Sequence, residues 1–248
     1  MSNELGGKTV LVTGAARRIG AAIARRLHAD GASVVLHYRG AEAEAAALEA
    51  ELNAARAGSA AKVKADLLAP VAPKVLVDCA LERFGRLDLL VNNASTFYPT
   101  AIGSIEAAQW EELIGSNLRA PLFIAQAAAA ELGKHGGAIV NIVDIHADRP
   151  LKGYAVYSIA KAGLAALTRA LALELGPAVR VNAVAPGAIA WPEDGQFPPP
   201  ERERIVATTP LGRLGSPEEI ARAVHFLATA PFVTGQVLAV DGGRSIFL

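Results

Sequence analysis

The feature that most constrains the fold of this 248-residue chain is the regular alternation of short apolar segments with segments of helical periodicity. The apolar, β-branched segments, which predict strands, are 8–13, 33–38, 61–64, 87–92, 138–143, 179–184 and 236–240. Helical spacing is found at 19–29, 41–57, 73–84, 105–132 (one long helix or a broken pair), 154–175 and 217–229, the last with Ser216 as N-cap. Apolar strands that alternate with helices predict a doubly wound, mostly parallel α/β sheet of the Rossmann type, in a single domain spanning 1–248.

Composition excludes several classes of function. Lys and Arg together number 24, as do Asp and Glu, so the chain has no basic field for nucleic acid or an anionic membrane. The one cysteine, Cys79, and five scattered histidines predict neither a disulfide nor a metal site. The polar N-terminus and the lack of an apolar run of ~18 residues predict a cytoplasmic protein with no membrane span.

One stretch, 185–204, shows no regular pattern and is rich in proline. It follows a predicted strand, and ligands bind outside the carboxyl ends of strands in this architecture. The stretch is therefore either a loop that covers a substrate or a variable surface insertion, and the pattern does not decide between them.

The turn after the first strand, Thr13–Gly20, has the composition of a phosphate-binding loop. Small residues such as Gly14 and Gly20 let the backbone approach a pyrophosphate, and the following helix offers N–H groups from Ile19 onward. A glycine-containing turn alone is weak support, but here it opens the first strand–helix unit. The sequence therefore predicts a dinucleotide site.

The end of the second strand indicates which dinucleotide binds. A site for NAD usually has an acid there, whereas this chain has His37, Tyr38 and Arg39. Arg39 and Arg18 can pair with a 2′-phosphate through the guanidinium fork. NADPH/NADP⁺ is the predicted cofactor, and the alternative is that both arginines are solvated surface charges.

Tyr157 and Lys161 open the long helix after the fifth strand. Residues four apart share one helix face, so the phenol and the ammonium can point into one cleft. We expect the lysine cation to lower the pKa of the phenol, which is ordinarily about 10, so that Tyr157 can protonate a carbonyl or imine that receives hydride. The pair predicts a reductase.

These features together resemble the short-chain dehydrogenase/reductase family over nearly the whole chain. The matching segments are Thr13–Gly20, Asn92-Asn93-Ala94, Asn117, Tyr157/Lys161, Pro186-Gly187, Thr234-Gly235 and Asp241-Gly242-Gly243. The resemblance implies that Asn117 braces a helix and a water relay to Lys161, and that Lys161 holds the nicotinamide ribose. It also implies a cofactor track that includes Asp66, Leu67, Asn93, Ala94, Ser95, Pro186 and Gly187.

Two departures from the family pattern resemble one subgroup, the pteridine reductases. Arg18 stands where the family usually has glycine, and Asp144 stands where it usually has serine, 13 residues before the tyrosine. Further segments match this subgroup: Ala15–Arg18, His37–Arg39, Ala94–Pro99, Asp144–His146 and Pro150–Tyr154. The resemblance implies NADPH-dependent reduction of a dihydropterin, with dihydrofolate or biopterin as further substrates. It implies substrate contacts from Arg18, Ser95, Phe97 (stacked on the pterin), Asp144 and Tyr157.

Each of these side chains also has a simpler interpretation. Asp144 suits proton delivery to a ring nitrogen better than serine, because a carboxyl can hold a proton and a carboxylate accepts N–H groups, yet it can merely cap the turn after the strand. Phe97 either stacks on substrate or packs in the core. Trp191 either walls the pocket or anchors its loop, His146 is expected to be a packing residue, and Cys79 an inert one.

Two other functions use the same motifs. A reductase of other carbonyls, such as a 3-oxoacyl thioester or a sugar or steroid ketone, would retain Tyr157 and Lys161 but need another role for Asp144. A non-catalytic dinucleotide sensor would not need the pair. The helices at 117–130 and 155–173 are rich in alanine and leucine. The resemblance implies that they meet across the subunit interfaces of a homotetramer, although burial within a monomer would favour the same composition.

Overall fold

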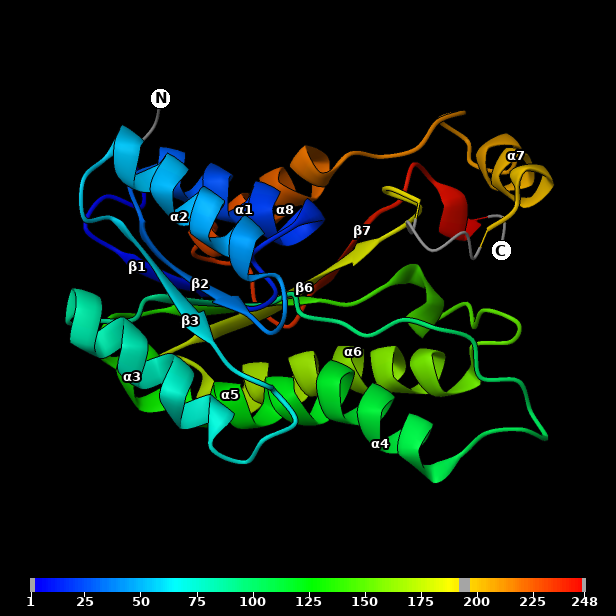
Figure 1. Cartoon of the computed structure of the whole chain (residues 1–248), viewed down its shortest axis with the longest axis horizontal. Coiled ribbons are helices and arrows are strands. Elements are labelled where there is room, and N and C mark those ends of the chain that lie inside the picture. Colours follow the sequence, from blue (N-terminus) through cyan, green and yellow to red (C-terminus); the bar gives the residue numbers. More distant parts are fainter. Residues whose placement is uncertain (1–2, 192–196, 247–248) are drawn as a thin grey trace.

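A seven-stranded parallel sheet forms the centre of the molecule, in the order β3-β2-β1-β4-β5-β6-β7 (Figure 1). The computed structural model describes residues 3–191 and 197–246. The strands are β1 (Thr9–Val12), β2 (Ser33–Tyr38), β3 (Ala60–Lys64), β4 (Leu89–Asn92), β5 (Ala138–Ile142), β6 (Arg180–Pro186) and β7 (Val237–Val240). The predicted doubly wound sheet is confirmed, and every pairing in it is parallel.

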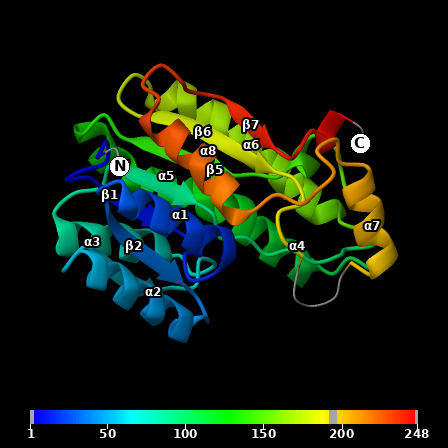
Figure 2. The same ribbon diagram turned by 90° about the horizontal axis from the view of Figure 1, so that it is seen from above.

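Helices cover both faces of the sheet, which explains why the strands are apolar throughout (Figures 1 and 2). One layer consists of α1 (Arg18–Ala29), α2 (Glu42–Ala55) and α8 (Pro217–Thr229). The opposite layer contains α3 (Ala72–Phe84), α5 (Ala120–Lys134) and α6 (Ala155–Leu175). Aliphatic side chains fill the space between each layer and the sheet, so the central strands β1, β2, β4, β5 and β6 are buried on both sides, whereas the edge strand β7 is partly exposed.

The strand order predicts where in this sheet a ligand-binding crevice lies. The chain runs outward from β1 to β2 and β3, then returns to add β4 on the other side of β1. Strand order reverses at β1/β4, and the loops after these two strands diverge at their carboxyl ends. Such a switch point is where open parallel sheets bind ligands.

The segment 105–132, predicted as one long helix or a broken pair, combines features of both. Helix α4 (Ala107–Ile114) continues through a π-helical turn, Gly115–Arg119, directly into α5. The chain is therefore helical throughout, but one wider turn interrupts it. Such turns often occur at functional sites.

The proline-rich stretch 185–204 contains a helix that the sequence analysis did not predict. Helix α7 (Pro199–Ala207) starts with two prolines in its first turn, where their missing N–H groups cost no hydrogen bond. Residues 192–196 of this stretch lie outside the described residues. The prediction of a wholly irregular segment is thus corrected, because the segment starts in the last residues of β6 and ends in α7.

Helix α8 begins as predicted, at Ser216. Ser216 and Glu219 form a reciprocal capping box, and Pro217 occupies the first helical position. The apolar face of α8 packs on α1. This packing closes the layer next to the loop that follows β1.

Among the described residues, one helix, α6, meets the length and composition criteria for a membrane span. It has 21 residues, and the mean hydropathy of its most apolar window is 1.3. The expectation that no such segment exists was therefore too strict. In this fold α6 packs against β6 and carries the buried Lys161, so its apolar composition is that of a core helix.

Candidate active site

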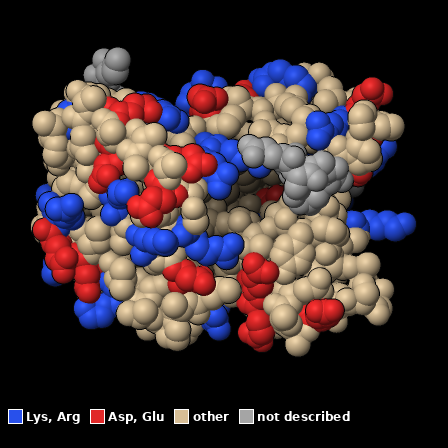
Figure 3. All heavy atoms as spheres, in the orientation of Figure 1, with Lys and Arg blue, Asp and Glu red and all other residues tan. Residues whose placement is uncertain are grey.

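Two neighbouring cavities open at the carboxyl ends of the strands. The catalytic cavity, about 560 Å³, is lined by residues that include Ser95, Phe97, Asp144, Tyr157, Lys161, Pro186, Gly187, Trp191, Arg204 and Arg244. The turn cavity, about 500 Å³, is lined by residues that include Gly14, Gly20, His37, Tyr38, Arg39, Asp66, Leu67 and Ala94. Arg17, Arg18, Ile19, Asn93 and Ser95 line both, so the cavities are continuous. Figure 3 shows a hollow at the centre of this face, with Lys and Arg side chains beside it.

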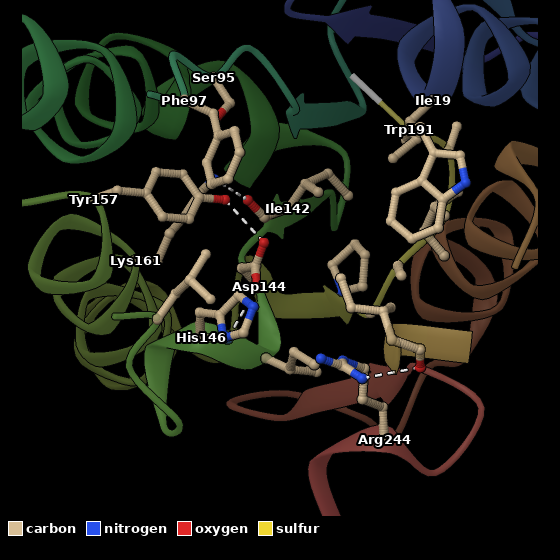
Figure 4. A pocket seen from close by; sticks show the side chains of 18 of the residues that line it. Ile19, Ser95, Phe97, Ile142, Asp144, His146, Tyr157, Lys161, Trp191 and Arg244 are labelled. Atoms are coloured by element: carbon tan, nitrogen blue, oxygen red, sulfur yellow. Dashed lines mark hydrogen bonds between the residues drawn. The ribbon is translucent and has the colours of Figure 1, made fainter. Parts of the chain in front are cut away.

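Tyr157 and Asp144 form the central hydrogen bond of the catalytic cavity (Figure 4). The Tyr157 hydroxyl donates to Oδ2 of Asp144 over 2.9 Å. Tyr157 lies in the first turns of α6, whereas Asp144 follows β5. The residue at the position usually occupied by serine is therefore in direct contact with the tyrosine.

The expected effect of Lys161 on Tyr157 is wrong in this structure. The pKa of Tyr157 is raised well above 10, first by burial and then by the charge and hydrogen bond of Asp144. A hydrogen bond with Ser95 acts in the opposite direction and is outweighed. Tyr157 is only 4% exposed, so water screens the nearby carboxylate poorly. The phenol is thereby held in its protonated form.

Lys161 lies beneath the ring of Tyr157. Its Nζ donates to the carbonyl oxygen of Ile142 over 2.9 Å and is 5.6 Å from the centre of the tyrosine ring. Burial lowers the pKa of Lys161 to about 8, and the Asp144 carboxylate partly opposes this. Lys161 is thus a nearly completely buried ammonium group with a backbone carbonyl as partner.

Asp144 caps the turn after β5, which is one of the two interpretations that the sequence left open, and it also contacts Tyr157. Its Oδ1 accepts the backbone N–H of His146 over 2.8 Å and so caps a short 3₁₀ turn, Ile145–Ala147. Its Oδ2 accepts the Tyr157 hydroxyl. The cap fixes the carboxylate in an orientation that directs the second oxygen at Tyr157. His146 bonds the Arg149 carbonyl, as expected for a packing residue.

Asn117 lies in the π-helical turn and anchors the loop after β4. Its Nδ2 donates to the carbonyls of Thr96 and Leu113, and its Oδ1 accepts the hydroxyl of Ser95 over 2.7 Å. Asn117 is fully buried. The structure therefore connects Asn117 to the catalytic cavity through Ser95, whereas Lys161 bonds Ile142.

Phe97 belongs to an aromatic cluster at the catalytic cavity. It stacks on Tyr154 with ring centres 4.7 Å apart, meets Tyr157 edge to face at 4.7 Å, and lies nearly parallel to Phe197 at 6.4 Å. Trp191 contacts Phe197 at 5.9 Å. Phe97 thus lines the cavity and also packs against neighbouring aromatic rings. Trp191 lines the same cavity.

The turn after β1 fits a pyrophosphate group. A Cβ on Gly20 would lie 2.1 Å from the carbonyl oxygen of Gly14, and Gly14 has a φ of +62°. Helix α1 starts at Arg18, and its N-cap residue Arg17 makes no side-chain hydrogen bond to the helix. The first N–H groups of α1 therefore face the turn cavity without a side-chain acceptor, as an anion requires. Asn93 braces the turn through the carbonyls of Thr13 and Gly14.

The backbone conformation at Arg18 explains why the family usually has glycine at this position. Its φ is +51°, in the left-handed region, which costs a residue with a side chain about 1 kcal/mol. Its guanidinium donates to the carbonyl of Ala190 over 2.8 Å and so faces the catalytic cavity. Arg18 also lines the turn cavity together with Arg39, so their pairing with a 2′-phosphate stays a prediction.

His37 lines the turn cavity and also supports the phosphate turn through a hydrogen bond. The backbone N–H of Gly14 donates to its Nδ1 over 3.1 Å, which assigns the ring proton to Nε2, bonded to the Ala65 carbonyl. Burial lowers the pKa of His37 to about 4. His37 is thus a neutral structural residue that orients the turn.

The remaining predicted cofactor residues are divided between the two cavities: Arg39, Asp66 and Ala94 line the turn cavity, and Gly187 lines the catalytic cavity. Arg39 is exposed beside the turn cavity, 4.0 Å from Glu112, and Asp66 accepts the backbone N–H of Leu68. The backbone N–H of Ala94 donates to Thr13. Gly187 approaches Asp241 so closely that a Cβ would lie 2.7 Å from that side chain.

The sequence analysis missed several cavity residues, among them Phe197, Arg204 and Arg244. Phe197 and Arg204 belong to the stretch that had no regular pattern; Phe197 precedes α7 and Arg204 lies in it. Arg244 follows the Asp241-Gly242-Gly243 motif, which is the one signal that pointed to it. Among the described residues, no group of three His, Cys, Asp or Glu side chains is arranged to hold a metal ion.

The chain matches known proteins over nearly its full length. Residues 14–245 match the family model described as enoyl-(acyl carrier protein) reductase. Pteridine reductase 1 of Leishmania tarentolae is 40% identical, with 95% of this chain and 96% of that protein covered. L-rhamnose 1-dehydrogenase (NAD(P)(+)) of Azotobacter vinelandii is 41% identical, covering 97% of this chain and 98% of that protein. The 3-oxoacyl-[acyl-carrier-protein] reductase of Synechocystis sp. is 37% identical, covering 98% and 99%. Together with the parallel sheet and the Tyr157–Lys161 pair, these matches establish that the chain belongs to the short-chain dehydrogenase/reductase family of NAD(P)(H)-dependent oxidoreductases.

Proposed function

We propose that this protein reduces the ring C=N bond of a dihydropterin with NADPH. The observation that carries the proposal is the hydrogen bond between Tyr157 and Asp144, because it places a carboxylate beside the proton donor. Phe97 offers a ring surface next to this pair. The 40% identity to a pteridine reductase supports the same substrate class.

The residues of the catalytic cavity can divide the chemistry as follows. NADPH, when bound, supplies a hydride to the ring carbon of the C=N bond. Tyr157 holds its proton, because burial and Asp144 raise the pKa of the phenol, and donates it to the ring nitrogen. The Asp144 carboxylate accepts N–H groups of the pterin and orients the ring. Lys161 supplies positive charge beneath Tyr157 as the phenolate forms.

Preference for NADPH over NADH follows from the charges at the turn cavity. Arg39 and Arg17 line it, and the residues at the end of β2 include no acid that would bind the ribose hydroxyls. Asp66, the acid that lines this cavity, is engaged with the backbone of Leu68. A 2′-phosphate beside Arg39 is therefore favoured.

A carbonyl reductase is the second candidate function. Tyr157 and Lys161 would serve a ketone equally well, and a 3-oxoacyl-[acyl-carrier-protein] reductase is 37% identical over its whole length. This candidate requires no carboxylate at Asp144. Asp144 is therefore the residue that discriminates between the two functions.

Substitution of Tyr157 and Asp144 tests the proposal. Tyr157→Phe should lower kcat with NADPH and dihydrobiopterin by about 10²- to 10⁴-fold, because the proton donor is lost. Asp144→Ser should lower kcat/KM for pterins more than for acetoacetyl-CoA, and Asp148→Ser, at an exposed acid nearby, is the matched control. The measurement is absorbance of NADPH with a panel of pterins and ketones. Turnover of ketones alone, unaffected by Asp144→Ser, would favour the second candidate, and tight NADPH binding without any turnover would indicate a sensor.

We further infer a cytoplasmic homotetramer with no nucleic-acid or membrane partner. Equal numbers of basic and acidic residues support the absence of a polyanionic partner. Exposed apolar side chains on α4 and α5, including Trp110 and Phe123, support contact between subunits.

A further inference from the structure

Arg244 is a buried cation at the far side of the catalytic cavity from Tyr157 (Figure 4). It is only 5% exposed. Its Nη1 donates to the carbonyl of Ile205 over 3.0 Å and to the hydroxyl of Thr208 over 2.7 Å. Among the described residues, no carboxylate forms an ion pair with it, although buried charges are normally paired.

A second arginine lies close to this unpaired cation. Arg204 of α7 lines the same cavity with an exposed side chain and forms an ion pair at 3.7 Å with Glu201, which also lines the cavity. Burial lowers the pKa of Arg244, the positive charge of Arg204 lowers it further, and the negative charge of Asp241 partly opposes both. Two guanidinium groups that repel each other in a partly enclosed cavity favour an anion between them.

Aromatic side chains connect the proposed ring site to this end of the cavity. Phe197 lies parallel to Phe97 at 6.4 Å and contacts Trp191, so the three rings form a continuous wall. The guanidinium of Arg202 lies 5.3 Å from the Trp191 ring centre. Such a wall suits an aromatic extension of the substrate, with its polar end toward the arginines.

We propose that Arg244 and Arg204 form a subsite for a carboxylate on the substrate's tail, with Arg244 as the specificity-determining residue. The substrate class is a dihydropterin that carries an aryl-amide and a carboxylate, as in dihydrofolate, rather than one with a short neutral side chain. The inference rests on the proposed function for the position of the pterin ring. The phosphate of a phosphopantetheine thioester is the competing source of an anion.

Kinetics with charged and neutral substrates test the subsite. Arg244→Met should raise KM for dihydrofolate about 10- to 100-fold, the usual effect of losing a hydrogen bond between charged groups. KM should change by less than about twofold for dihydrobiopterin and for dihydrofolate with both carboxylates converted to amides. Arg222→Met, at an exposed arginine of α8, is the matched control. Equal losses for all three substrates would show that Arg244 only docks α7, and would overturn the inference.

A binding experiment keeps the subsite separate from the proposed reaction. Calorimetry on the NADP⁺-loaded protein should detect p-aminobenzoyl-glutamate but not its diamide, and Arg244→Met should abolish this binding, whereas Arg244→Lys should retain part of it. Arg244-dependent binding of 4′-phosphopantetheine instead would overturn the carboxylate assignment. Binding of p-aminobenzoyl-glutamate without turnover of any pterin would refute the proposed function and leave the subsite standing.

Discussion

The carboxylate of Asp144 has two hydrogen-bonding partners, and together they determine what Tyr157 can do. One oxygen caps the turn after β5 and the other accepts the Tyr157 hydroxyl. Burial raises the pKa of Tyr157, and the charge and hydrogen bond of Asp144 raise it further. The residue that distinguishes this chain from most of its family therefore also keeps the proton on the donor.

The buried cation of Lys161 should lower the unfolding free energy of the protein. Its pKa is lowered from 10.5 to about 8, which corresponds to roughly 3 kcal/mol of unfavourable free energy when it is charged at pH 7. Lys161→Met should remove this cost and the hydrogen bond to Ile142, worth about 1 kcal/mol, so the net gain in unfolding free energy is about 2 kcal/mol. Urea unfolding measures it, and the variant should lack reductase activity.

The free-energy cost of burying the Lys161 cation should depend on pH. Below pH 8 both states hold the proton and the cost is fully present. It disappears as the pH rises from 8 to 10.5, because the folded protein releases the proton first. The advantage of Lys161→Met should therefore shrink over that range, while Lys152→Met, at an exposed lysine, should show no such trend. A constant advantage at every pH would contradict the assignment.

His37 should make the fold sensitive to acid. Its pKa is about 4 in the folded protein and about 6.5 when unfolded, so the unfolded chain takes up the proton first as the pH falls. Stability is lost between pH 6.5 and 4, by roughly 3 kcal/mol. His37→Gln can accept the N–H of Gly14 without titrating, so its unfolding free energy should decline less over this range. His135→Gln is the control, and a decline identical to wild type in His37→Gln would refute the prediction.

Among the elements, the π-helical turn between α4 and α5 contributes most to the site. The wider turn places Asn117 where its amide can bond both the preceding helical turn and the loop after β4. Ser95 is held through that amide, and Ser95 in turn contacts Tyr157. A regular α-helix has a different register at this point, so the irregularity serves to position the loop.

Asn117→Ala should destabilise the protein and also slow catalysis. Loss of several buried hydrogen bonds should lower the unfolding free energy by about 2–3 kcal/mol, and release of Ser95 should lower kcat by about tenfold or more. The matched control is Asn53→Ala, because Asn53, in α2, makes three hydrogen bonds to backbone groups around the start of β3, away from the catalytic cavity. We expect urea unfolding to show a similar loss of unfolding free energy in both variants, whereas only Asn117→Ala should lower kcat. Equal kcat in both would show that Asn117 is purely structural.

At the scale of the whole molecule, the strand order is what assembles the site. The loops after β1, β4, β5 and β6 converge at one edge of the sheet because all the strands are parallel. The phosphate turn, the Asn93–Phe97 loop, Asp144 and Pro186-Gly187 therefore meet although they are far apart in the chain. The same arrangement leaves an apolar face on α4 and α5 exposed.

We expect that face to mediate assembly. Light scattering should give a mass about four times the 25.6 kDa of one chain. Leu122→Glu combined with Phe123→Glu should reduce it, because these side chains are 37% and 45% exposed on α5 and like charges would oppose one another across a symmetric contact. Val71→Glu, at an exposed residue before α3, should leave the mass unchanged. A wild-type mass of one chain would refute the expectation.

The sequence alone determined the fold class and most element positions, because the hydrophobic period and local turn signals act over short distances. Predicted and observed segments agree closely for β2, α6 and α8, where caps and glycine–proline stops are strong. The Tyr157–Lys161 pair was also predictable, since residues four apart share a helix face. Asp144 was recognised by its spacing from Tyr157.

Only the tertiary structure decided how these residues act, because pKa values and side-chain directions depend on neighbours distant in sequence. Burial and Asp144, rather than Lys161, control the pKa of Tyr157. Arg18 bonds the carbonyl of Ala190, 172 positions away, and His37 bonds the phosphate turn as well as lining the turn cavity. Arg244 reaches the cavity because α7 folds over the C-terminal segment, and no local pattern encodes that contact.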